Sequence, residues 1–289
     1  MELTLRNISK TYGDVQVLNN VSFDLKPGVY GLLGANGSGK TTLFRILCGL
    51  MKPTRGDVQY NQQNILREAE NFRCILGFLP QDFRYYPDFS GLKFMLYVAS
   101  LKGLNRKVAK KKCKELLELV GLSDVQNRKI KTYSGGMKQR LGIAQAMIND
   151  PEVLVLDEPT VGLDPKERVR FRNLLSSFSE EKIVILSTHI VSDVEYISDE
   201  ILILKQGSLI NRGTPQKLVH EIDGAVWECV VPDKLVHQLT QKYTVSNQKH
   251  SDEGIVLRIV SIEQPLKSAR QVTPTLEDLY LHYFREEAL

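Results

Sequence analysis

Eight residues near the start of the chain set its architecture: Gly34-Ala35-Asn36-Gly37-Ser38-Gly39-Lys40-Thr41. The glycines allow the backbone to turn its N–H groups inward, where they can hold phosphate oxygens. Lys40 supplies a positive charge for the β- and γ-phosphates, and Thr41 supplies a hydroxyl for Mg²⁺. A chance match to this pattern is the alternative, on the order of one chain in a hundred from ordinary glycine and lysine frequencies. The stretch predicts a loop that binds nucleotide phosphates.

The sequence on either side of this loop supports the prediction. Val29–Leu33 is a short apolar run that leads directly into the loop, and Thr41–Leu50 has the pattern of a helix. A phosphate loop requires a strand before it and a helix after it. The N-terminus of that helix adds a partial positive charge at the phosphates. This context makes a chance match less favoured.

A second element follows much later in the sequence. The apolar run Val153–Leu156 reads as a buried strand, and it ends in Asp157 and Glu158. A parallel strand delivers such acids to the carboxyl edge of the sheet, where the phosphate loop also lies. We expect Asp157 to hold Mg²⁺ through water, and Glu158 to orient and deprotonate the attacking water. The alternative is a buried strand with two solvated acids at its end, and the phosphate loop upstream disfavours it.

Strand and helix patterns alternate over most of the chain. Residues 92–148 read as helical throughout, and the segment 167–179 reads as a helix between two later strands. Alternating strands and helices predict an α/β fold, in which helices cover both faces of a parallel sheet and the long helical stretch is an insertion. The predicted strands are 2–8, 15–25, 29–33, 58–60, 74–79, 153–156, 183–186 and 201–204.

Further motifs, in the same order along the chain, resemble those of the ATP-binding-cassette (ABC) ATPases. The segment Tyr133-Ser134-Gly135-Gly136-Met137-Lys138-Gln139-Arg140 resembles the family's signature sequence, although tyrosine and methionine stand where leucine and glutamine are commonest. The remaining matches are Pro80-Gln81 to the Q-loop, Gly162-Leu163-Asp164-Pro165 to the D-loop, and Ser187-Thr188-His189 to the switch histidine. Tyr12 is similar to the aromatic residue that stacks on adenine, with an ordinary loop residue as the alternative. The resemblance covers about residues 1–215.

The resemblance implies an ATPase with a P-loop core, an antiparallel β subdomain and a helical subdomain at about residues 82–150. It also implies that two cassettes face each other head to tail with two ATP molecules between them. Its implied catalytic residues are Glu158, His189 and Gln81, and its implied Mg²⁺ ligands are Thr41, Gln81 and Asp157. The implied nucleotide-binding residues are Tyr12, Gly34, Asn36, Gly37, Ser38, Gly39, Lys40, Thr41, Thr42, Ser134, Gly135, Gly136 and Asp164.

Physical reasons can be given for the roles of Ser134, at the start of a predicted helix, and of Gln81, beside the helical insertion. Ser134 has the character of a helix N-cap, with Gly135 and Gly136 opening the helix. Such a helix end attracts phosphate, and in the family it serves the γ-phosphate on the partner cassette. Gln81 would sense the γ-phosphate or Mg²⁺ and move with the helical insertion. One chain would therefore contribute two half-sites.

The last part of the chain, residues 216–289, reads as a small α+β accessory domain. Strands are predicted at 225–231, 244–248 and 255–260, with a helix at 233–243. A disordered tail is the alternative, and the apolar content disfavours it. The segment Thr273–Tyr280 resembles the terminus of exporter-type cassettes, a subgroup with bacterial drug, antibiotic-resistance and lantibiotic-immunity systems. A final helix is expected from its apolar stripe: Leu276, Leu279, Tyr280, Tyr283 and Phe284.

Composition narrows the setting. The 289 residues carry a net charge of +4, which alone does not argue for a nucleic-acid partner, and none is expected. The four cysteines are far apart without a CxxC pair, so neither a disulfide framework nor a zinc site is expected. No apolar run approaches the roughly 18 residues that span a bilayer, and the start lacks a signal peptide. We expect a cytoplasmic protein that does not itself cross a membrane.

The resemblance implies two partners: a membrane-spanning permease and a second ATPase subunit, either the same chain or a related one. The protein would then lie on the cytoplasmic face of a bacterial-type membrane. The aromatic stretch Asp82–Phe89 suits a docking surface, or it packs the insertion's own core. Arg106–Lys114, in which six of nine residues are basic, could approach anionic lipid, but a solvated helix face is favoured.

The alternative function is that of a soluble ABC ATPase that acts on the ribosome or on nucleic acid. A translation-associated cassette protein would normally carry two cassettes, and this chain has one. A DNA-repair cassette would carry a long coiled coil between its motifs. A GTPase or kinase with a phosphate loop would lack the Ser-Gly-Gly signature at Ser134–Gly136.

Overall fold

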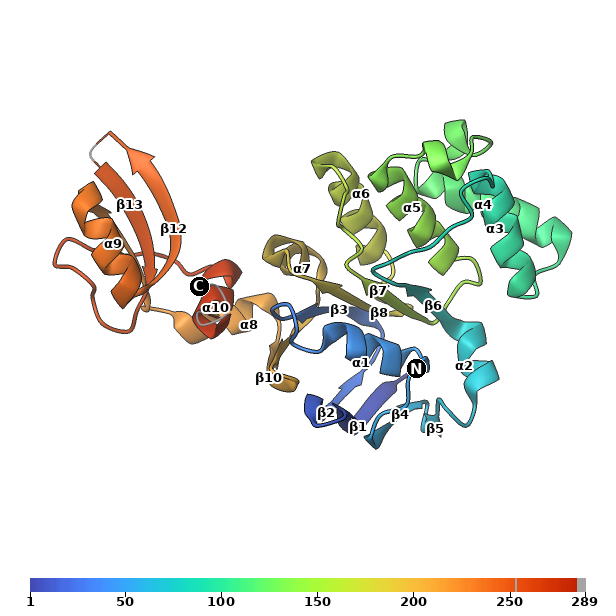
Figure 1. Ribbon diagram of the computed structural model, residues 1–289, viewed down its shortest axis with the longest axis horizontal. Helices are drawn as coiled ribbons and strands as arrows, with labels where there is room; N and C mark the ends of the chain where they lie inside the picture. The colour runs from blue at the N-terminus through green and yellow to red at the C-terminus, as the bar shows by residue number, and fades with distance from the viewer. Residues whose placement is uncertain (253, 285–289) are drawn as a thin grey trace. The chain divides into compact units, whose positions relative to one another are not determined.

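The computed structural model describes residues 1–252 and 254–284. It divides into two compact units, Met1–Asn211 and Arg212–Leu289, and each is considered by itself (Figure 1). The accessory domain expected at 216–289 includes residues 285–289, which lie outside the described part of the chain. The first unit contains the phosphate loop.

A six-stranded sheet in the order β10-β9-β3-β8-β7-β6 forms the centre of the first unit. The pairs β9–β3, β3–β8, β8–β7 and β7–β6 are parallel, so their carboxyl ends meet at one edge. Strands β3, β7 and β8 are buried along their whole length, which explains their apolar sequences. In sheet order, the strands are Ser208–Gly213, Glu200–Lys205, Gly28–Leu33, Ile183–Thr188, Val153–Asp157 and Leu76–Leu79.

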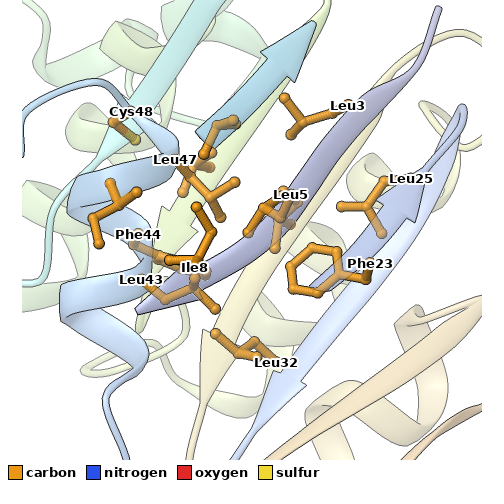
Figure 2. Close-up of a cluster of buried hydrophobic side chains, with 14 of the residues drawn as sticks. Leu3, Leu5, Ile8, Phe23, Leu25, Leu32, Leu43, Phe44, Leu47 and Cys48 are labelled. Carbon is orange, nitrogen blue, oxygen red and sulfur yellow. The ribbon is translucent and has the colours of Figure 1, made fainter. Parts of the chain in front are cut away.

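An antiparallel sheet of order β2-β1-β4-β5 lies on the other side of helix α1 (Lys40–Leu47). Leucine and phenylalanine side chains from this sheet and from α1 form one apolar cluster with Leu32 of β3, as Figure 2 shows. The cluster fixes α1, and hence the loop that precedes it, between the two sheets. The strands, in sheet order, are Val15–Leu25, Leu3–Tyr12, Arg55–Tyr60 and Gln63–Asn64.

The helical insertion contains α3 (Gly91–Leu101), α4 (Arg106–Leu119) and α5 (Gly135–Ala146), which pack on one another. Each begins at a residue whose side chain accepts a hydrogen bond from the first turn. These N-caps are Ser90, Asn105 and Ser134. Short 3₁₀ turns at Ser123–Val125 and Ile130–Thr132 connect α4 to α5. The α/β fold with an antiparallel β subdomain and an inserted helical subdomain is confirmed.

One predicted strand starts too early. Residues Cys74 and Ile75 belong to α2 (Ala69–Ile75), and β6 begins at Leu76, where pairing with Val153 starts. A short apolar run does not distinguish a strand from a buried helix end by its periodicity. Helices α6 (Pro165–Ser176) and α7 (Val191–Ile197) follow the strands that carry the later motifs.

The second unit is built on an antiparallel sheet of order β12-β13-β11-β14. Helix α9 (Asp233–Lys242) packs on this sheet through Leu239, and the sheet contributes Leu257 and Ile259 to the same core. The two-residue strand β14 was not predicted, and α8 (Pro215–Val219) and α10 (Leu276–Phe284) complete the unit. The strands, in sheet order, are Thr244–Ser251, Gly254–Val260, Val226–Val231 and Arg270–Gln271.

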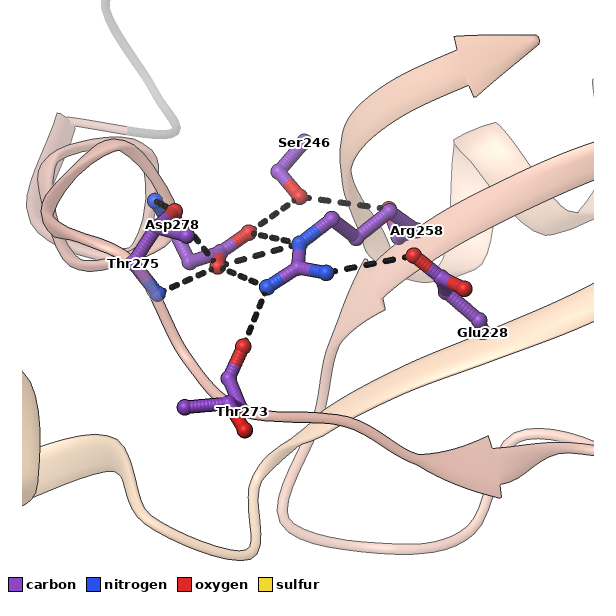
Figure 3. Close-up of polar contacts among 6 residues, drawn as sticks. All are labelled: Glu228, Ser246, Arg258, Thr273, Thr275 and Asp278. Carbon is purple, nitrogen blue, oxygen red and sulfur yellow. Dashed lines mark hydrogen bonds and ion pairs between the residues drawn. The ribbon is translucent and has the colours of Figure 1, made fainter.

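A buried carboxylate ties α10 to this sheet (Figure 3). Asp278 is 1% exposed and forms an ion pair with Arg258 of β13, with 2.8 Å between Nη2 and Oδ2. Ser246 Oγ donates to the same carboxylate at 2.5 Å, and the N–H and hydroxyl of Thr275 each donate at 2.8 Å. Burial would raise the pKa of Asp278, but the bonds from Arg258, Ser246 and Thr275 lower it. The carboxylate is therefore ionised and saturated with donors.

Candidate functional site

The phosphate loop connects the end of β3 to the start of α1. Gly37 and Gly39 adopt φ angles of 80° and 104°, which residues with side chains rarely adopt. A Cβ on Gly39 would also lie 2.9 Å from the backbone carbonyl oxygen of Val17, which disfavours any side chain there. The Lys40 ammonium donates to the carbonyl oxygen of Gly34 at 2.6 Å and to that of Ala35 at 2.9 Å. These bonds hold the cation inside the curve of the loop.

The two acids lie at the carboxyl edge of the same sheet, as the sequence predicted. Asp157 is 2% exposed, and its Oδ1 accepts a hydrogen bond from Ser187 Oγ at 2.5 Å. Glu158 has a φ of 54°, in the left-handed region. Its N–H donates to Ser187 Oγ at 3.0 Å and to the Ser187 carbonyl oxygen at 3.2 Å. A non-glycine residue in this conformation costs on the order of 1–3 kcal/mol, which the surrounding bonds must offset.

Within residues 1–252 and 254–284, the Glu158 carboxylate has one hydrogen-bonding partner. Its Oε2 lies 2.9 Å from Nδ1 of His189, which follows β8. The Glu158 side chain is 8% exposed and that of His189 is 53% exposed. The histidine thus orients the carboxylate while its own ring stays accessible to a ligand.

One pocket gathers these groups. Gln81, which follows β6, lines it together with both acids and the phosphate loop. A cation, two hydroxyls, two amides and two carboxylates therefore face one space, which is what phosphoryl-transfer chemistry requires. The lining residues are Val17, Asn36, Gly37, Gly39, Lys40, Thr41, Thr42, Gln81, Asp157 and Glu158.

The pocket residues fit a nucleotide with Mg²⁺. No group of three or more His, Cys, Asp or Glu side chains among the described residues could hold a metal ion by itself. Mg²⁺ is commonly bound by one or two carboxylates together with substrate phosphates. Thr41 and Asp157 match that pattern. The buried Ser38 Oγ has no hydrogen-bond partner within residues 1–252 and 254–284, as expected for a group that serves a polar ligand.

Other predicted site residues lie outside this pocket. Tyr12 is 43% exposed, and its hydroxyl donates to Met51 Sδ at 2.8 Å. Ser134 is the N-cap of α5, as predicted, and its Oγ accepts from the Met137 N–H at 3.2 Å. Asp164 caps α6 by accepting from the Glu167 N–H at 2.8 Å. The signature glycines open α5: Gly135 is exposed and Gly136 is buried.

Three residues of the site were missed by the sequence analysis. Val17 lines the pocket from β2, and Ser187 holds both acids. Gln139 of α5 donates its amide to the carbonyl oxygens of Glu158 and Pro159. Ser187 and Gln139 stand inside recognised motifs, but each acts on a segment far away in sequence. No local pattern signals such contacts.

The sequence is similar to transporter proteins along nearly its whole length. Residues 18–161 match the ABC transporter family model. An uncharacterised ABC transporter ATP-binding protein of Bacillus subtilis is 32% identical over 96% of this chain and 98% of that protein. The Nod factor export ATP-binding protein I of Burkholderia orbicola is 34% identical over 97% and 92%. The linearmycin resistance ATP-binding protein of Bacillus subtilis is 32% identical over 97% of each.

Solved structures are similar to the first part of the chain. A dimeric structure of a bacterial ABC transporter cassette has a TM-score of 0.69 and 28% identity, over 73% of this chain and 98% of that one. A post-hydrolysis state of the same cassette, bound to ADP and phosphate, has a TM-score of 0.68 and 28% identity.

Proposed function

This chain belongs to the ABC transporter family of ATPases, and from that premise we propose that it powers export through a separate membrane permease. It binds and hydrolyses ATP. The convergence of Lys40, Asp157, Glu158 and His189 at one sheet edge carries the assignment of the active site. Relatives named for Nod factor export and linearmycin resistance support the direction of transport.

The geometry supports a division of labour in hydrolysis. Glu158 takes a proton from the attacking water, and His189 holds its carboxylate and presents a ring to the γ-phosphate. Lys40 and the loop N–H groups stabilise negative charge on the phosphates. Thr41 and Asp157 would hold Mg²⁺, with Gln81 beside them, and the bound ion would supply further charge neutralisation.

A second cassette completes the site in this proposal. Ser134 and Gly135 are exposed at the start of α5 and do not line the pocket of their own chain. A helix N-terminus with free N–H groups suits the γ-phosphate on a partner cassette. The dimeric structure of a similar cassette supports this arrangement. In the Ser134→Arg variant, ATP should still bind but ATP-driven dimers should disappear from sizing profiles; persistent dimers would contradict the proposal.

We propose the aromatic patch Tyr86, Phe89 and Tyr97 as the permease contact. Tyr86 stacks on Phe89 with 5.0 Å between ring centroids and meets the Tyr97 ring edge-on at 5.4 Å. Tyr86 is 48% exposed, whereas Tyr85 is half-buried against Phe83. The two adjacent tyrosine side chains therefore point in different directions.

The patch continues along α3 to a hollow. Leu101, one turn after Tyr97, is 69% exposed, and Leu50 at the rim of the hollow is 63% exposed. Lys102 and Phe78 line the hollow as well. Exposed aromatic and leucine side chains beside a concave surface suit an amphipathic helix of a partner protein.

In this proposal, the protein is held at the membrane by its contact with the permease. Among the described residues, no helix combines the length and the apolar character needed to cross a bilayer. We therefore propose a peripheral position on the cytoplasmic face of a bacterial cell membrane.

The proposed function is tested by measuring ATP hydrolysis and retention of the protein in the membrane fraction. Purified protein should hydrolyse ATP, and removal of Mg²⁺ with a chelator should abolish turnover. Co-expressed with its permease, the protein should be retained in the membrane fraction, and Tyr86→Ala with Tyr97→Ala should release it while leaving basal ATPase intact. Tyr196→Ala, which removes a tyrosine that is 73% exposed on α7, is the matched control. Loss of basal ATPase with full retention would refute this docking surface.

A further inference from the structure

The Gln139 side chain joins the signature helix α5 to the backbone that carries Glu158. Its Nε2 donates to the carbonyl oxygen of Pro159 at 3.1 Å and to that of Glu158 at 3.3 Å. The side chain is half-buried, and both acceptors lie directly after β7. A single amide thus connects the helical insertion to the edge of the central sheet where the acids lie.

Glu158 needs such support because its backbone is strained. Its φ of 54° is stable only if contacts on both sides of the residue fix it. Ser187 holds the N–H side through two acceptors, and Gln139 holds the carbonyl side. The bonds on the N–H side restrain φ of Glu158 and those on the carbonyl side restrain its ψ, so together they fix the Cα from which the carboxylate reaches His189. Gln139 therefore anchors this backbone together with Ser187 and with the Val161 N–H, which donates to the Glu158 carbonyl oxygen at 3.4 Å.

The start of α5 is also held against the segment that follows Glu158. A Cβ on Gly136 would lie 2.8 Å from Glu167 Oε2 and 3.0 Å from the Gly162 carbonyl oxygen, so the two backbones pack without room for a side chain. Arg140 Nη2 forms an ion pair with Glu167 Oε1 at 2.8 Å, and both side chains are 18% exposed. Together with the Gln139 amide, these contacts tie the start of α5 to residues 158–167.

We infer that Gln139 is a positioning residue that couples the signature helix to the catalytic glutamate of its own chain. The inference rests on the proposed function, in which Ser134 meets the partner's nucleotide and Glu158 activates water. Ser134 and Gln139 are close along α5, because five residues of helix span about 7.5 Å. A shift of α5 when Ser134 engages phosphate is therefore transmitted to the Glu158 carbonyl. The rate of hydrolysis at the site that contains Glu158 then depends on whether Ser134 of the same chain contacts the nucleotide bound to the partner cassette.

The first test compares two glutamines on the same helix. Gln139→Met removes the donor and keeps the length of the side chain. Gln145→Met is the control, because the Gln145 amide donates to the Phe78 carbonyl oxygen at 2.9 Å, away from Glu158. We expect Gln139→Met to lower kcat about tenfold or more, as for a small misplacement of a reacting group, with KM for ATP within about twofold. Gln145→Met should leave kcat near that of the wild type.

The second test uses pH. In Gln139→Glu, an ionised carboxylate would face two carbonyl oxygens and repel them, whereas the protonated acid can donate a hydrogen bond. The ratio of variant to wild-type kcat should therefore rise as the pH falls from about 8 to about 6, because burial beside carbonyl dipoles favours the protonated form. A residue with only a structural role would give a constant ratio.

Glu158→Gln, measured in parallel, distinguishes a failure of the proposed active site from a failure of the proposed coupling. If this variant keeps wild-type turnover, the proposed active site is wrong. If it loses turnover while Gln139→Met keeps a wild-type kcat, or while the Gln139→Glu ratio is flat with pH, only the coupling is refuted. Equal losses of kcat in Gln139→Met and Gln145→Met would also refute it.

Discussion

Glu158 in the first unit and Asp278 in the second are both buried carboxylates, and their surroundings are opposite in kind. Asp278 accepts hydrogen bonds from Arg258, Ser246 and Thr275 and lies on regular helix. In the described part of the chain, the Glu158 carboxylate is bonded to His189 alone, and the residue has a strained backbone. Bonds that saturate a carboxylate leave it no lone pair for a reactant, whereas a carboxylate with few partners can accept a proton. The comparison indicates that bonding, rather than burial, distinguishes the structural acid Asp278 from Glu158, the proposed catalytic acid.

The largest expected effect comes from removing the charge of the under-bonded acid. Glu158→Gln should keep ATP binding and lower kcat by about 10²–10⁴, the usual loss when a general base is removed. The thermal midpoint should stay near that of the wild type, because few bonds are lost. Glu181→Gln, which changes an exposed acid outside the pocket, should be neutral in both assays. Near-normal turnover in Glu158→Gln would break the comparison.

The saturated acid should show the reverse behaviour. Asp278→Asn removes the buried counter-charge of the Arg258 guanidinium, which keeps an ion pair with Glu228 at 3.2 Å, so the free energy of unfolding of the second unit should fall by at most about 3–5 kcal/mol. Basal ATPase of the folded protein should not change. The adjacent Glu277 is exposed, and Glu277→Gln is the matched control. Denaturant titration of the full chain measures the stability. A large fall in kcat with unchanged stability would show that Asp278 is not a structural acid.

A smaller effect is expected in how the stability of the second unit depends on pH, through the ionisation of Asp278. Hydrogen bonds lower the pKa of Asp278 in the folded protein, so its ionised form contributes stability that is fully present above the ordinary aspartate value of about 4. This contribution should be lost as the pH falls from there through the lowered value. Unfolding of the second unit, followed against pH, should show this loss in the wild type and a shallower dependence in Asp278→Asn. Identical profiles would mean that the carboxylate is not linked to folding.

The sequence predicted the parts of the site that one segment encodes. Spacing and residue type identified the phosphate loop at Gly34–Thr41, the acids after Val153–Leu156 and the cap at Ser134. The roles of Ser187 and Gln139 could not be predicted, since both depend on which strands and helices become neighbours. The Arg258–Asp278 pair was missed for the same reason. The start of β6 was wrong by two residues because Cys74 and Ile75 are as apolar as the strand that follows.

The order of the central strands also bears on how the protein is made. Gly28 of β3 pairs with Ile183 of β8, so most of the first unit must be synthesised before β3 gains either neighbour. At about 5–20 residues per second, that wait is on the order of ten seconds. By contrast, the antiparallel sheet is complete by Asn64, and its apolar face already packs α1 and Leu32. Proteolysis of ribosome-stalled chains that end before and after β8 would show whether β3 becomes protected when β8 has been synthesised. We expect this early sheet to shield β3 on the emerging polypeptide until its partners leave the ribosome.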